Sequence, residues 1–410
     1  MDTSNKLPNI PFSPPRMDQK ILDEVCAALK SGWITTGPRT KEFEKKIAAY
    51  CGCTHALALN SATAGLEIML RWFGVGPGDE VILPAYTYSA TANVVVHCGA
   101  KPVFVDSLPD HFNIDPLEIQ KAITPRTKVV MPVDFAGWPC DYHSIKSIVE
   151  IEQKKFNPQT PEQKQLGRIL ILSDSAHSFG ALYHGKPAGS LADVSVFSFH
   201  AVKNLTTAEG GAVVLNLPSD FDAEAIYKAL CIKILHGQTK DALSKNQPGQ
   251  WRYDIVEAGY KYNMTDIAAA IGLIELERYN SETLPRRRQI MERYNEAFKN
   301  QLHWTLPRIQ AHNICSSYHL YPLLLNALTE NQRDTVIQQM GVRGIAVNVH
   351  FIPVPQMTFY KNLGYQLSDY VNAKKHFEHE ISLPVYFDLN ESLQNRVIDS
   401  IVQIYHQVCA

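Results

Sequence analysis

Side chains able to do chemistry gather between residues 169 and 215. Apolar runs at 169–172 and 194–199 have the composition of buried strands, and a third run, at 212–215, follows a Glu-Gly-Gly turn. Asp174 lies at the end of the first run, and Lys203 follows the second. Taken singly, an aspartate at a strand end commonly caps a turn, and a lysine is commonly a solvated surface charge. An acid and an amine at neighbouring strand ends can instead face one bound group.

This pair suits the chemistry of pyridoxal phosphate, which needs a lysine for its aldehyde and an acid beside its pyridinium nitrogen. A carboxylate stabilises a neighbouring cation, so Asp174 would keep the ring protonated and electron-poor. The Lys203 amine must be neutral to attack an aldehyde or to move a proton, and burial lowers a lysine pKa toward that state. The surrounding glycines let the backbone approach a ligand closely; they are Gly180, Gly185, Gly189, Gly210 and Gly211.

A second candidate site lies earlier in the chain, where a strand at 55–59 meets a helix at 63–73. The small residues at 61–64 leave backbone amides accessible at the start of that helix. A helix N-terminus with accessible amides binds anions, so this junction could hold a cofactor phosphate. An ordinary helix cap is the alternative interpretation of the same residues.

Composition narrows the class of protein. The chain has 410 residues, of which 45% are hydrophobic and 20% charged, which is typical of a globular protein with a sizeable core. The formal net charge of -2 gives no basic excess for nucleic acid. No apolar run approaches the roughly 20 residues of a membrane span, and the N-terminus lacks the features of a signal peptide. We therefore expect a cytoplasmic protein with neither a membrane nor a nucleic acid as partner. Of the eight cysteines, only Cys51 and Cys53 are closely spaced, so we expect no metal site.

Strands and helices alternate along the chain, which predicts an α/β fold with a mostly parallel sheet. Further strands are expected at 81–83, 103–105 and 129–133, with helices at 18–30, 42–50, 89–98 and 142–152. Residues 154–167 are polar and contain two prolines, which predicts a surface insertion. A helix is expected at 264–279 after a polar loop that begins at 236.

The last third of the chain continues the alternation. A helix at 284–300 precedes a strand at 318–325, a helix at 333–340, a strand at 346–350 and a helix at 393–408. We expect a large cofactor-binding domain at 1–283, with a Pro-rich N-terminal arm, and a small C-terminal α/β domain at 284–410.

The run DSAHSFGALYHGKPAGSLADVSVFSFHAVKNLTTAEGG resembles the lysine signature of the DegT/DnrJ/EryC1/StrS family of sugar-nucleotide aminotransferases. The motifs SGWITTGP, SATAG and GYKYN extend the resemblance from about residue 10 to about residue 386. It implies pyridoxal-phosphate fold type I, which is aspartate aminotransferase-like, with a seven-stranded sheet. It also implies transfer of an amino group from L-glutamate to a nucleotide-linked ketosugar, with a UDP-4-keto sugar as the best candidate, in polysaccharide biosynthesis.

The resemblance also implies a role for particular residues. Lys203 would hold the cofactor and then move the proton, and Ser198 would bind the phosphate. Tyr88 would lie against the pyridine ring, and His177 would contact its ring oxygen, although a structural histidine is the alternative there. The implied cofactor contacts are Thr63, Ala64, Tyr88, Asp174, His177, Ser198, Lys203 and Asn263. The implied substrate contacts are Thr35, Thr36 and His350. Because Asn263 would reach the phosphate of the neighbouring subunit, we expect a homodimer with shared active sites.

Three other functions agree less well with the sequence. Some members of the family are sugar dehydratases that replace the lysine with histidine, and Lys203 argues against that activity. A catalytically silent or regulatory relative would also bind the cofactor, and the intact set of Asp174, Ser198 and Lys203 disfavours it. A nicotinamide oxidoreductase is disfavoured because no G-x-G-x-x-G follows an early strand.

Overall fold

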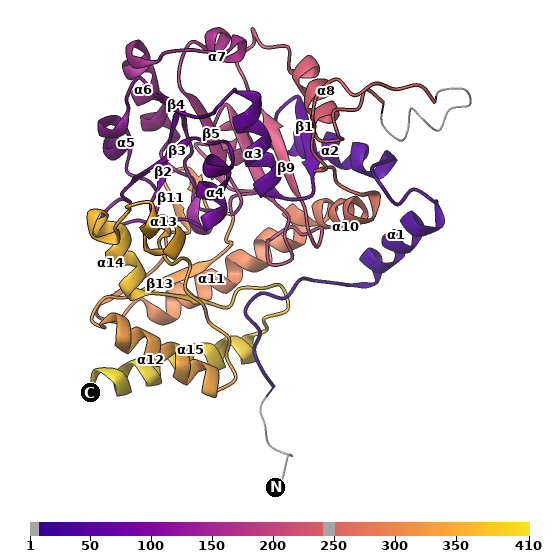
Figure 1. The fold of residues 1–410 in the computed structure, drawn as a ribbon. Coiled ribbons are helices and arrows are strands. Elements are labelled where there is room, and N and C mark those ends of the chain that lie inside the picture. Colours follow the sequence, from indigo (N-terminus) through magenta and orange to yellow (C-terminus); the bar gives the residue numbers. More distant parts are fainter. Residues whose placement is uncertain (1–7, 241–250) are drawn as a thin grey trace.

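A seven-stranded sheet forms the centre of the molecule (Figure 1). The computed structural model describes residues 8–240 and 251–410; residues 1–7 of the expected arm and 241–250 of the expected loop lie outside the described residues. The strand order is β1-β9-β8-β5-β4-β2-β3. In that order the strands are β1 (His55–Leu59), β9 (Gly211–Leu215), β8 (Val194–Ser198), β5 (Leu170–Asp174), β4 (Thr127–Val130), β2 (Glu80–Pro84) and β3 (Lys101–Val105).

Only β9 runs against its neighbours in this sheet; it is antiparallel to β1 and β8, and the remaining adjacent pairs are parallel. The mostly parallel sheet expected from the sequence is therefore confirmed. Every residue of β2, β4, β5 and β9 is buried, as continuous apolar runs predict for strands covered on both faces. The parallel strands β5 and β8 are paired through Asp174 and Val196, so their carboxyl ends lie at one edge of the sheet.

Helices follow the strands in the expected alternation. In the first part of the chain they are α1 (Gln19–Lys30), α2 (Pro38–Cys51), α3 (Ala62–Trp72), α4 (Ser89–His97), α5 (Pro116–Ala122), α6 (Tyr142–Ile151), α7 (Pro161–Leu166) and α8 (Ala223–Lys233). Then come α10 (Asp266–Glu277), α11 (Leu284–Phe298), α12 (Glu330–Val342), α13 (Thr358–Asn362), α14 (Val371–His379) and α15 (Glu391–Cys409). Asp18 caps α1 as the sequence predicts, accepting a hydrogen bond from the Ile21 amide at 3.4 Å.

Two smaller sheets complete the architecture. The three-stranded sheet has the order β10 (Trp304–Thr305), β13 (Tyr321–Leu325) and β14 (Glu380–Leu383). It packs with α11, α12 and α15 around a second hydrophobic cluster, separate from the one around the large sheet. The four-stranded sheet has the order β11 (Gln310–Ala311), β12 (Ile314–Cys315), β6 (Leu182–Tyr183) and β7 (Lys186–Pro187). Because the C-terminal third contributes to both clusters, the domain boundary at 283 stays a prediction.

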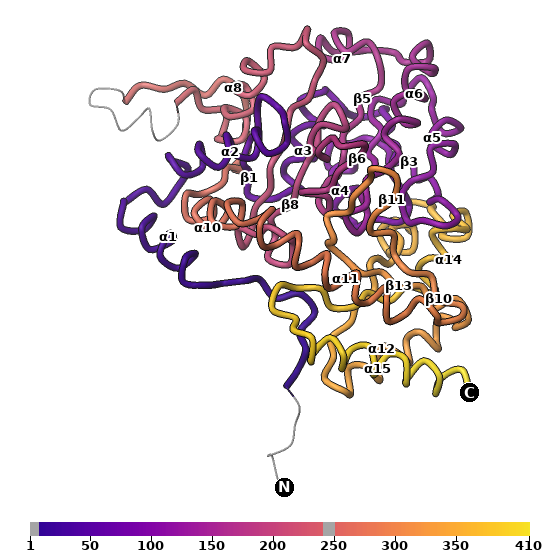
Figure 2. Tube along the Cα trace, turned by 180° about the vertical axis from the view of Figure 1, so that it is seen from behind, coloured from indigo at the N-terminus to yellow at the C-terminus, as the bar shows by residue number. Residues whose placement is uncertain are grey.

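The N-terminal arm connects the two clusters. Figure 2 shows the indigo segment running from α1 toward α12 and α15. Ile10 is buried in the second cluster, and its amide donates to the Gly344 carbonyl at 2.8 Å. Phe12, two residues later, packs against the cluster around the large sheet. The arm is therefore fixed to the last third of the chain before it reaches α1.

The expected strand at 346–350 is wrong. The segment makes a single isolated bridge, between Asn348 and Ser382, in place of a strand. Beyond that bridge the backbone of His350 is taken by side chains, because its amide donates to Glu380 Oε2 at 2.9 Å and its carbonyl accepts from the Tyr86 hydroxyl at 2.6 Å. The strand expected at 318–325 is shorter in the structure, because β13 begins at Tyr321. The helix expected at 264–279 is also shorter: α10 spans Asp266–Glu277, and a π-helical turn follows at Tyr279–Thr283.

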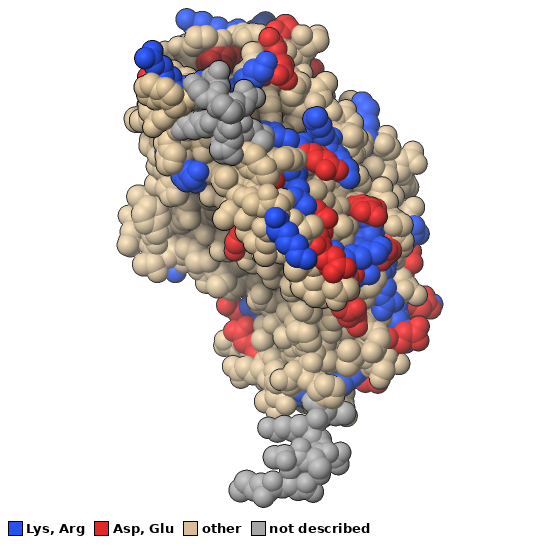
Figure 3. Space-filling view, turned by 90° about the vertical axis from the view of Figure 1, so that its right-hand side faces the viewer, with Lys and Arg blue, Asp and Glu red and all other residues tan. Residues whose placement is uncertain are grey.

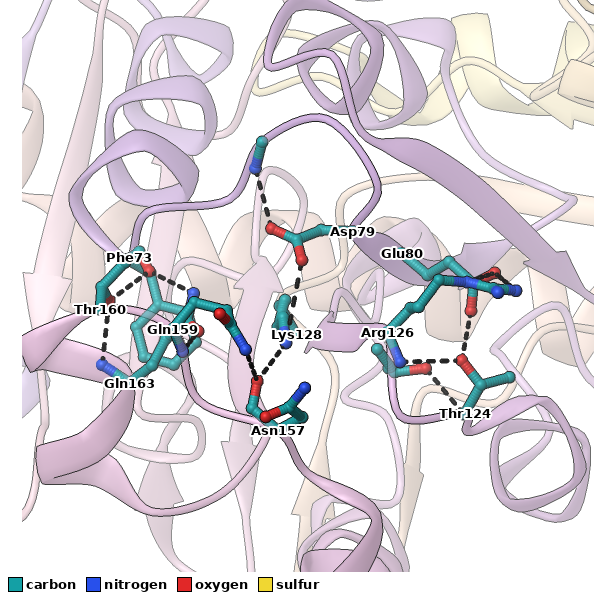
Figure 4. A network of polar contacts seen from close by, with 12 residues as sticks. Phe73, Asp79, Glu80, Thr124, Arg126, Lys128, Asn157, Gln159, Thr160 and Gln163 are labelled. Carbon is teal, nitrogen blue, oxygen red and sulfur yellow. Dashed lines mark hydrogen bonds and ion pairs between the residues drawn. The ribbon is translucent and has the colours of Figure 1, made fainter.

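The insertion at 154–167 is docked onto the end of α3 (Figure 4). Thr160 Oγ1 and Gln163 Nε2 both donate to the Phe73 carbonyl, at 3.3 and 2.8 Å. From β4, the buried Lys128 amine donates to the Asn157 carbonyl. The segment therefore satisfies a carbonyl that the end of a helix leaves without an intrahelical partner. The Gln163 side chain is buried, so the insertion packs into the protein as well as lying on its surface.

Among the residues that the structure describes, no helix is long and apolar enough to cross a membrane. On the face shown in Figure 3, basic and acidic side chains are interspersed, and no continuous basic surface is visible there. The visible charge distribution agrees with the small net charge of the sequence.

Candidate active site

Asp174 ends β5 at the wall of a pocket of about 360 Å³. Its Oδ2 accepts from the Thr91 hydroxyl at 2.8 Å, and its Oδ1 accepts from the Ala176 amide at 3.2 Å. Thr91 lies on α4, and its hydroxyl is 2.9 Å from that of Thr87, so a short polar chain fixes the carboxylate. Burial raises the pKa of Asp174, and the Thr91 and Ala176 hydrogen bonds oppose that rise. A cation bound at this end of the pocket would restore the ionised form.

Lys203 lines the same pocket, on the turn that follows β8. Its amine makes no hydrogen bond or ion pair with any residue of the described ranges, although its backbone amide is held by the His200 carbonyl at 2.9 Å. Burial lowers the pKa of Lys203 to about 8, and the charge of Asp174 opposes this shift. At pH 7 roughly a tenth of the amine is therefore neutral and available for attack on a carbonyl. The structure thus places Asp174 and Lys203 at the same pocket.

The N-terminus of α3 forms another wall. Ser61 caps the helix through its hydroxyl, which accepts from the Ala64 amide at 3.1 Å. Ala64 is consequently buried with its amide engaged, outside the pocket wall, whereas Thr63 and Ser198 line it. Within the described ranges, no acceptor meets the amides of Ala62 and Thr63, which are therefore available to an anion.

Gly211 fixes the position of this helix start. It opens β9, and a Cβ placed on it would lie 2.5 Å from the Ala62 nitrogen and 2.6 Å from the Ser61 carbonyl carbon. Only a residue without a side chain lets β9 and the first turn of α3 approach so closely. The accessible amides therefore have a position that is set by backbone contact with the sheet.

His177 and His319 face each other in the pocket wall, with ring centroids 4.5 Å apart. His177 Nδ1 accepts from the Ala136 amide at 3.2 Å, so the neutral ring carries its proton on Nε2. His319 Nδ1 lies 2.8 Å from Asn204 Oδ1 and donates to it, which leaves His319 Nε2 as an acceptor. Burial lowers the pKa of both rings well below the ordinary value, and Lys203 adds to the effect. His177 is therefore a neutral hydrogen-bond donor.

His350 also lines the pocket. Its Nδ1 lies 2.9 Å from Ser382 Oγ, and the ring of Phe12 from the arm stacks on it at 5.3 Å. Burial and the nearby Lys203 lower its pKa to about 3. Tyr88, at the start of α4, lines the pocket with 61% of its surface exposed, which leaves its ring open to a flat ligand.

Thr35, Thr36 and Asn263 do not line this pocket. They form a separate group, in which Asn263 Nδ2 donates to Thr36 Oγ1 at 2.7 Å and Thr36 Oγ1 donates to the Met264 carbonyl at 2.6 Å. The Thr35 carbonyl accepts from the Asp266 amide at 2.9 Å. The loop and the GYKYN segment, which are more than 200 residues apart in the sequence, are thus joined as one surface.

Among the residues that sequence reasoning missed, Phe12 and His319 line the pocket, and Thr91 holds the Asp174 carboxylate. Thr91 lies three residues after Tyr88, one helical turn along α4, so the helical spacing alone could have indicated it. Phe12 is the one aromatic residue of the expected arm. His319 lies directly after Tyr318, inside the strand expected at 318–325, and that expectation concealed its position in a loop.

A second buried carboxylate lies behind the pocket. The Asp134 amide donates to the Asp174 carbonyl at 3.2 Å. Its carboxylate accepts from Ser178 Oγ at 2.7 Å, from the Cys140 amide at 2.8 Å and from the Tyr142 hydroxyl at 2.9 Å. Burial raises the pKa of Asp134 to about 6, against these hydrogen bonds. Asp134 anchors the loop after β4 without entering the pocket.

The pocket fits pyridoxal phosphate on its own residues. The unengaged amides of α3 suit the phosphate, and Asp174 suits a ring nitrogen. Lys203 has a free amine of lowered pKa on the same cavity. These groups, at the carboxyl ends of parallel strands, define a pyridoxal-phosphate-dependent enzyme.

Comparison with known proteins agrees. The model of the DegT/DnrJ/EryC1/StrS aminotransferase family matches residues 15–402, and the chain belongs to this family. The protein Spr1654 of Streptococcus pneumoniae, described as a sugar aminotransferase in its PMP form, superposes with a TM-score of 0.94 and 45% identity, over 98% of this chain and 100% of that chain. Spr1654 also has a PLP form with the same TM-score.

Two relatives are similar over nearly their whole length. The spore coat polysaccharide biosynthesis protein SpsC of Bacillus subtilis is 35% identical over 401 residues, which are 96% of this chain and 97% of SpsC. Protein MJ1066 of Methanocaldococcus jannaschii is 40% identical over 398 residues, 96% of this chain and 97% of MJ1066. The chain is therefore a pyridoxal-phosphate-dependent sugar aminotransferase with the expected aspartate aminotransferase-like fold.

Proposed function

We propose that the enzyme transfers the amino group of L-glutamate to a nucleotide-linked ketosugar, with a UDP-4-keto sugar as the acceptor, for polysaccharide biosynthesis in the cytoplasm. The observation that carries the proposal is the free amine of Lys203 on the same pocket as the buried carboxylate of Asp174. The similarity to SpsC supports a polysaccharide product. The reaction releases 2-oxoglutarate and an aminated sugar, so nitrogen and electrons balance between the two substrates.

The bound cofactor supplies an electron sink for the carbon that loses its proton. Lys203 Nζ takes the proton from the α-carbon of glutamate and, in the second half of the reaction, delivers one to the sugar carbon that receives nitrogen. A pKa of about 8 suits both directions, because proton transfer is most efficient when the pKa lies near the working pH. Asp174 holds the ring nitrogen protonated, with its oxygens oriented by Thr91 and Ala176.

The remaining expected contacts divide between two groups. In the pocket, Thr63 and Ser198 would bind the phosphate together with the α3 amides, Tyr88 would lie against the ring, and His177 would donate Nε2–H to a ring oxygen. His350 faces the substrate.

Asn263, Thr35 and Thr36 would act on the pocket of a second copy of the chain, with Asn263 on the phosphate and the threonines on the sugar. Their separation from the pocket of their own chain supports this assignment, and hence a homodimer with shared sites. Ala64 contributes only as a part of the helix that positions Thr63, because its amide is bonded to Ser61.

An absorption spectrum tests the first half of the proposal. We expect the visible band of protein-bound pyridoxal phosphate to bleach when L-glutamate is added, and to return with the correct UDP-4-keto sugar. Lys203→Ala should abolish the bleaching, whereas Lys228→Ala, on the exposed surface of α8, should leave it unchanged. A band that is indifferent to glutamate in the unmodified enzyme would exclude glutamate as the donor. Loss of bleaching in both variants would remove Lys203 from its role.

A further inference from the structure

Three side chains form a continuous hydrogen-bonded path from the pocket wall into the protein interior. His350 Nδ1 lies 2.9 Å from Ser382 Oγ, which lies 2.5 Å from Glu380 Oε1. Glu380 and Ser382 are alternate residues of β14, so their side chains share one face of the strand. Both are completely buried. Burial of a carboxylate costs folding free energy when no cation pairs with its oxygens, and no described residue forms such a pair with Glu380. A group of this kind often has a functional role.

We propose that Glu380, Ser382 and His350 form a proton relay through which His350 accepts or donates one proton at the pocket while its imidazole stays neutral. His350 Nε2, the ring nitrogen opposite the Ser382 contact, has no hydrogen-bond partner among the described residues, and the ring lines the pocket. The geometry assigns catalysis to His350 and positioning to Ser382 and Glu380. The identity of the atoms served by the relay rests on the proposed amino transfer.

The protons balance along the path. In the form with one proton fewer, His350 Nδ1–H donates to Ser382 Oγ, whose hydroxyl donates to ionised Glu380, and Nε2 is bare. When Nε2 takes a proton, the Nδ1 proton passes to Ser382 and the hydroxyl proton passes to Glu380 Oε1. The products are a neutral imidazole with Nε2–H and a neutral carboxylic acid. The reverse transfer delivers the proton to the pocket.

The titratable neighbours favour this partition. Lys203, His177 and His319 line the same pocket as His350, and burial with the Lys203 charge disfavours an imidazolium there. Burial raises the pKa of Glu380 to about 8. Arg333 on α12 opposes that rise but donates to the backbone carbonyl of Glu380, at 2.7 Å, rather than to the carboxylate. The proton is thus stored on Glu380 near neutral pH.

Two further contacts fix the path. Tyr86 donates to the His350 carbonyl at 2.6 Å, and the His350 amide donates to Glu380 Oε2 at 2.9 Å, so the mobile proton belongs on Oε1. The Phe12 ring stacks on the imidazole with an interplanar angle of 26° and covers that face. A fixed and partly covered imidazole exchanges protons along the path rather than with water.

Amino transfer needs such a group beside Lys203. The glutamate ammonium must lose a proton before its nitrogen can attack, and the ketone oxygen of the sugar must gain protons to leave as water. Lys203 is occupied with the proton on carbon, so a second acid–base group is needed for nitrogen and oxygen. A relay that keeps the net charge off the His350 imidazole can serve both directions in a pocket that contains Lys203 and would contain the protonated ring of the bound cofactor.

The position of the proton on the His350 ring tests the relay, and it can be measured without an activity assay. We would label histidine with ¹⁵N, load the enzyme with pyridoxal phosphate and record the ring resonances from about pH 6.5 to about pH 9.5, the interval around the proposed proton loss. His350→Gln identifies the resonances. The expected result is a change from Nε2–H to Nδ1–H as the pH rises through about 8, with no cationic ring at any point.

Matched variants separate the relay from simple packing. Glu380→Gln should hold Nε2–H at every pH, because the amide donates to Ser382 as the neutral acid does. Ser382→Ala should abolish the change, and Ser400→Ala, a buried serine of α15, should not affect it. With the sugar acceptor, Ser382→Ala and Glu380→Gln should each lower kcat by roughly 10²-fold and flatten the pH profile near 8, with cofactor loading unchanged.

One tautomer throughout this pH range in the unmodified enzyme, or the same change in Ser382→Ala, would overturn the relay. The bleaching of the cofactor band by glutamate is recorded on the same samples. The relay can therefore fail while amino transfer holds, and amino transfer can fail while the tautomer still changes.

Discussion

Replacement of Asp266 should detach the N-terminus of α2 from α10. The N-cap residue of α2 is Gly37, which has no side chain to cap the helix, and the Asp266 carboxylate supplies the cap from 229 residues away. Oδ1 accepts from the Gly37 amide at 2.8 Å, the Thr40 amide at 2.9 Å and the Thr40 hydroxyl at 2.7 Å. Oδ2 accepts from the Arg39 amide at 3.1 Å. Asp266 itself is completely buried.

The magnitude follows from the donors that lose their partner. Asp266→Ala leaves two buried amides without an acceptor, and each costs about 1–3 kcal/mol. The loss of a negative charge at a helix N-terminus adds about 0.5–1 kcal/mol. We therefore expect about 4 kcal/mol of lost stability. Asp266→Asn keeps an acceptor oxygen for Gly37 and Thr40 but turns an amide toward the Arg39 N–H, and should cost about 1–2 kcal/mol.

Urea unfolding monitored by circular dichroism measures both losses as shifts of the midpoint at constant slope. Asp222→Ala is the matched control, because Asp222 caps α8 at the surface, through the Ala225 amide at 3.0 Å, and should cost only about 1 kcal/mol. A loss below about 1 kcal/mol for Asp266→Ala, or equal losses for the two Asp266 variants, would refute the hydrogen-bond accounting.

Three further outcomes are expected. Thr91→Val removes the strongest hydrogen bond to Asp174 and should raise the pKa of this carboxyl further. The rate constant measured with glutamate in single-turnover assays should then fall by roughly 10-fold, and Thr87→Val should lower it less. The raised pKa of Asp134 means that its contribution to stability is present below about pH 4 and is lost as the pH rises to about 6. Asp134→Asn should therefore remove about 3 kcal/mol of pH dependence between those limits, measured as the slope of urea midpoints against pH. Gln163→Ala should cost about 1–2 kcal/mol in the same unfolding assay and leave the cofactor band unchanged, because it removes the shorter of two hydrogen bonds to the Phe73 carbonyl, and Phe73 does not line the pocket; a changed band would contradict that separation.

The sequence predicted the seven strands of the large sheet and the principal chemistry because both depend on local patterns. Continuous apolar runs gave the buried strands, and strand ends in a parallel sheet meet at one edge, which brought Asp174 and Lys203 to one pocket. The strand predicted at 346–350 is wrong for a physical reason that no local sequence pattern indicates. The backbone of His350 is bonded by Glu380 and Tyr86, and a buried carboxylate competes with the ladder that a strand would need.

The pocket itself could be predicted only in part. His319 and Phe12 come from segments that approach the sheet through tertiary packing, and neither stands in a pattern that points to a ligand. The group of Thr35, Thr36 and Asn263 was expected at the site by resemblance, and one chain keeps it elsewhere. An arrangement that depends on a second subunit cannot be tested by the contacts of the first.

The contact at Gly211 has a consequence for variation in this enzyme. Its φ is not in the left-handed region, so the position demands space rather than a special backbone conformation. Every amino-acid change that one base can make in a glycine codon adds at least a Cβ, and that atom would already meet the first turn of α3. A saturation mutagenesis library selected for growth should therefore lose alanine at this position as completely as tryptophan. Fitness would fall in a single step at the first carbon rather than in proportion to side-chain volume.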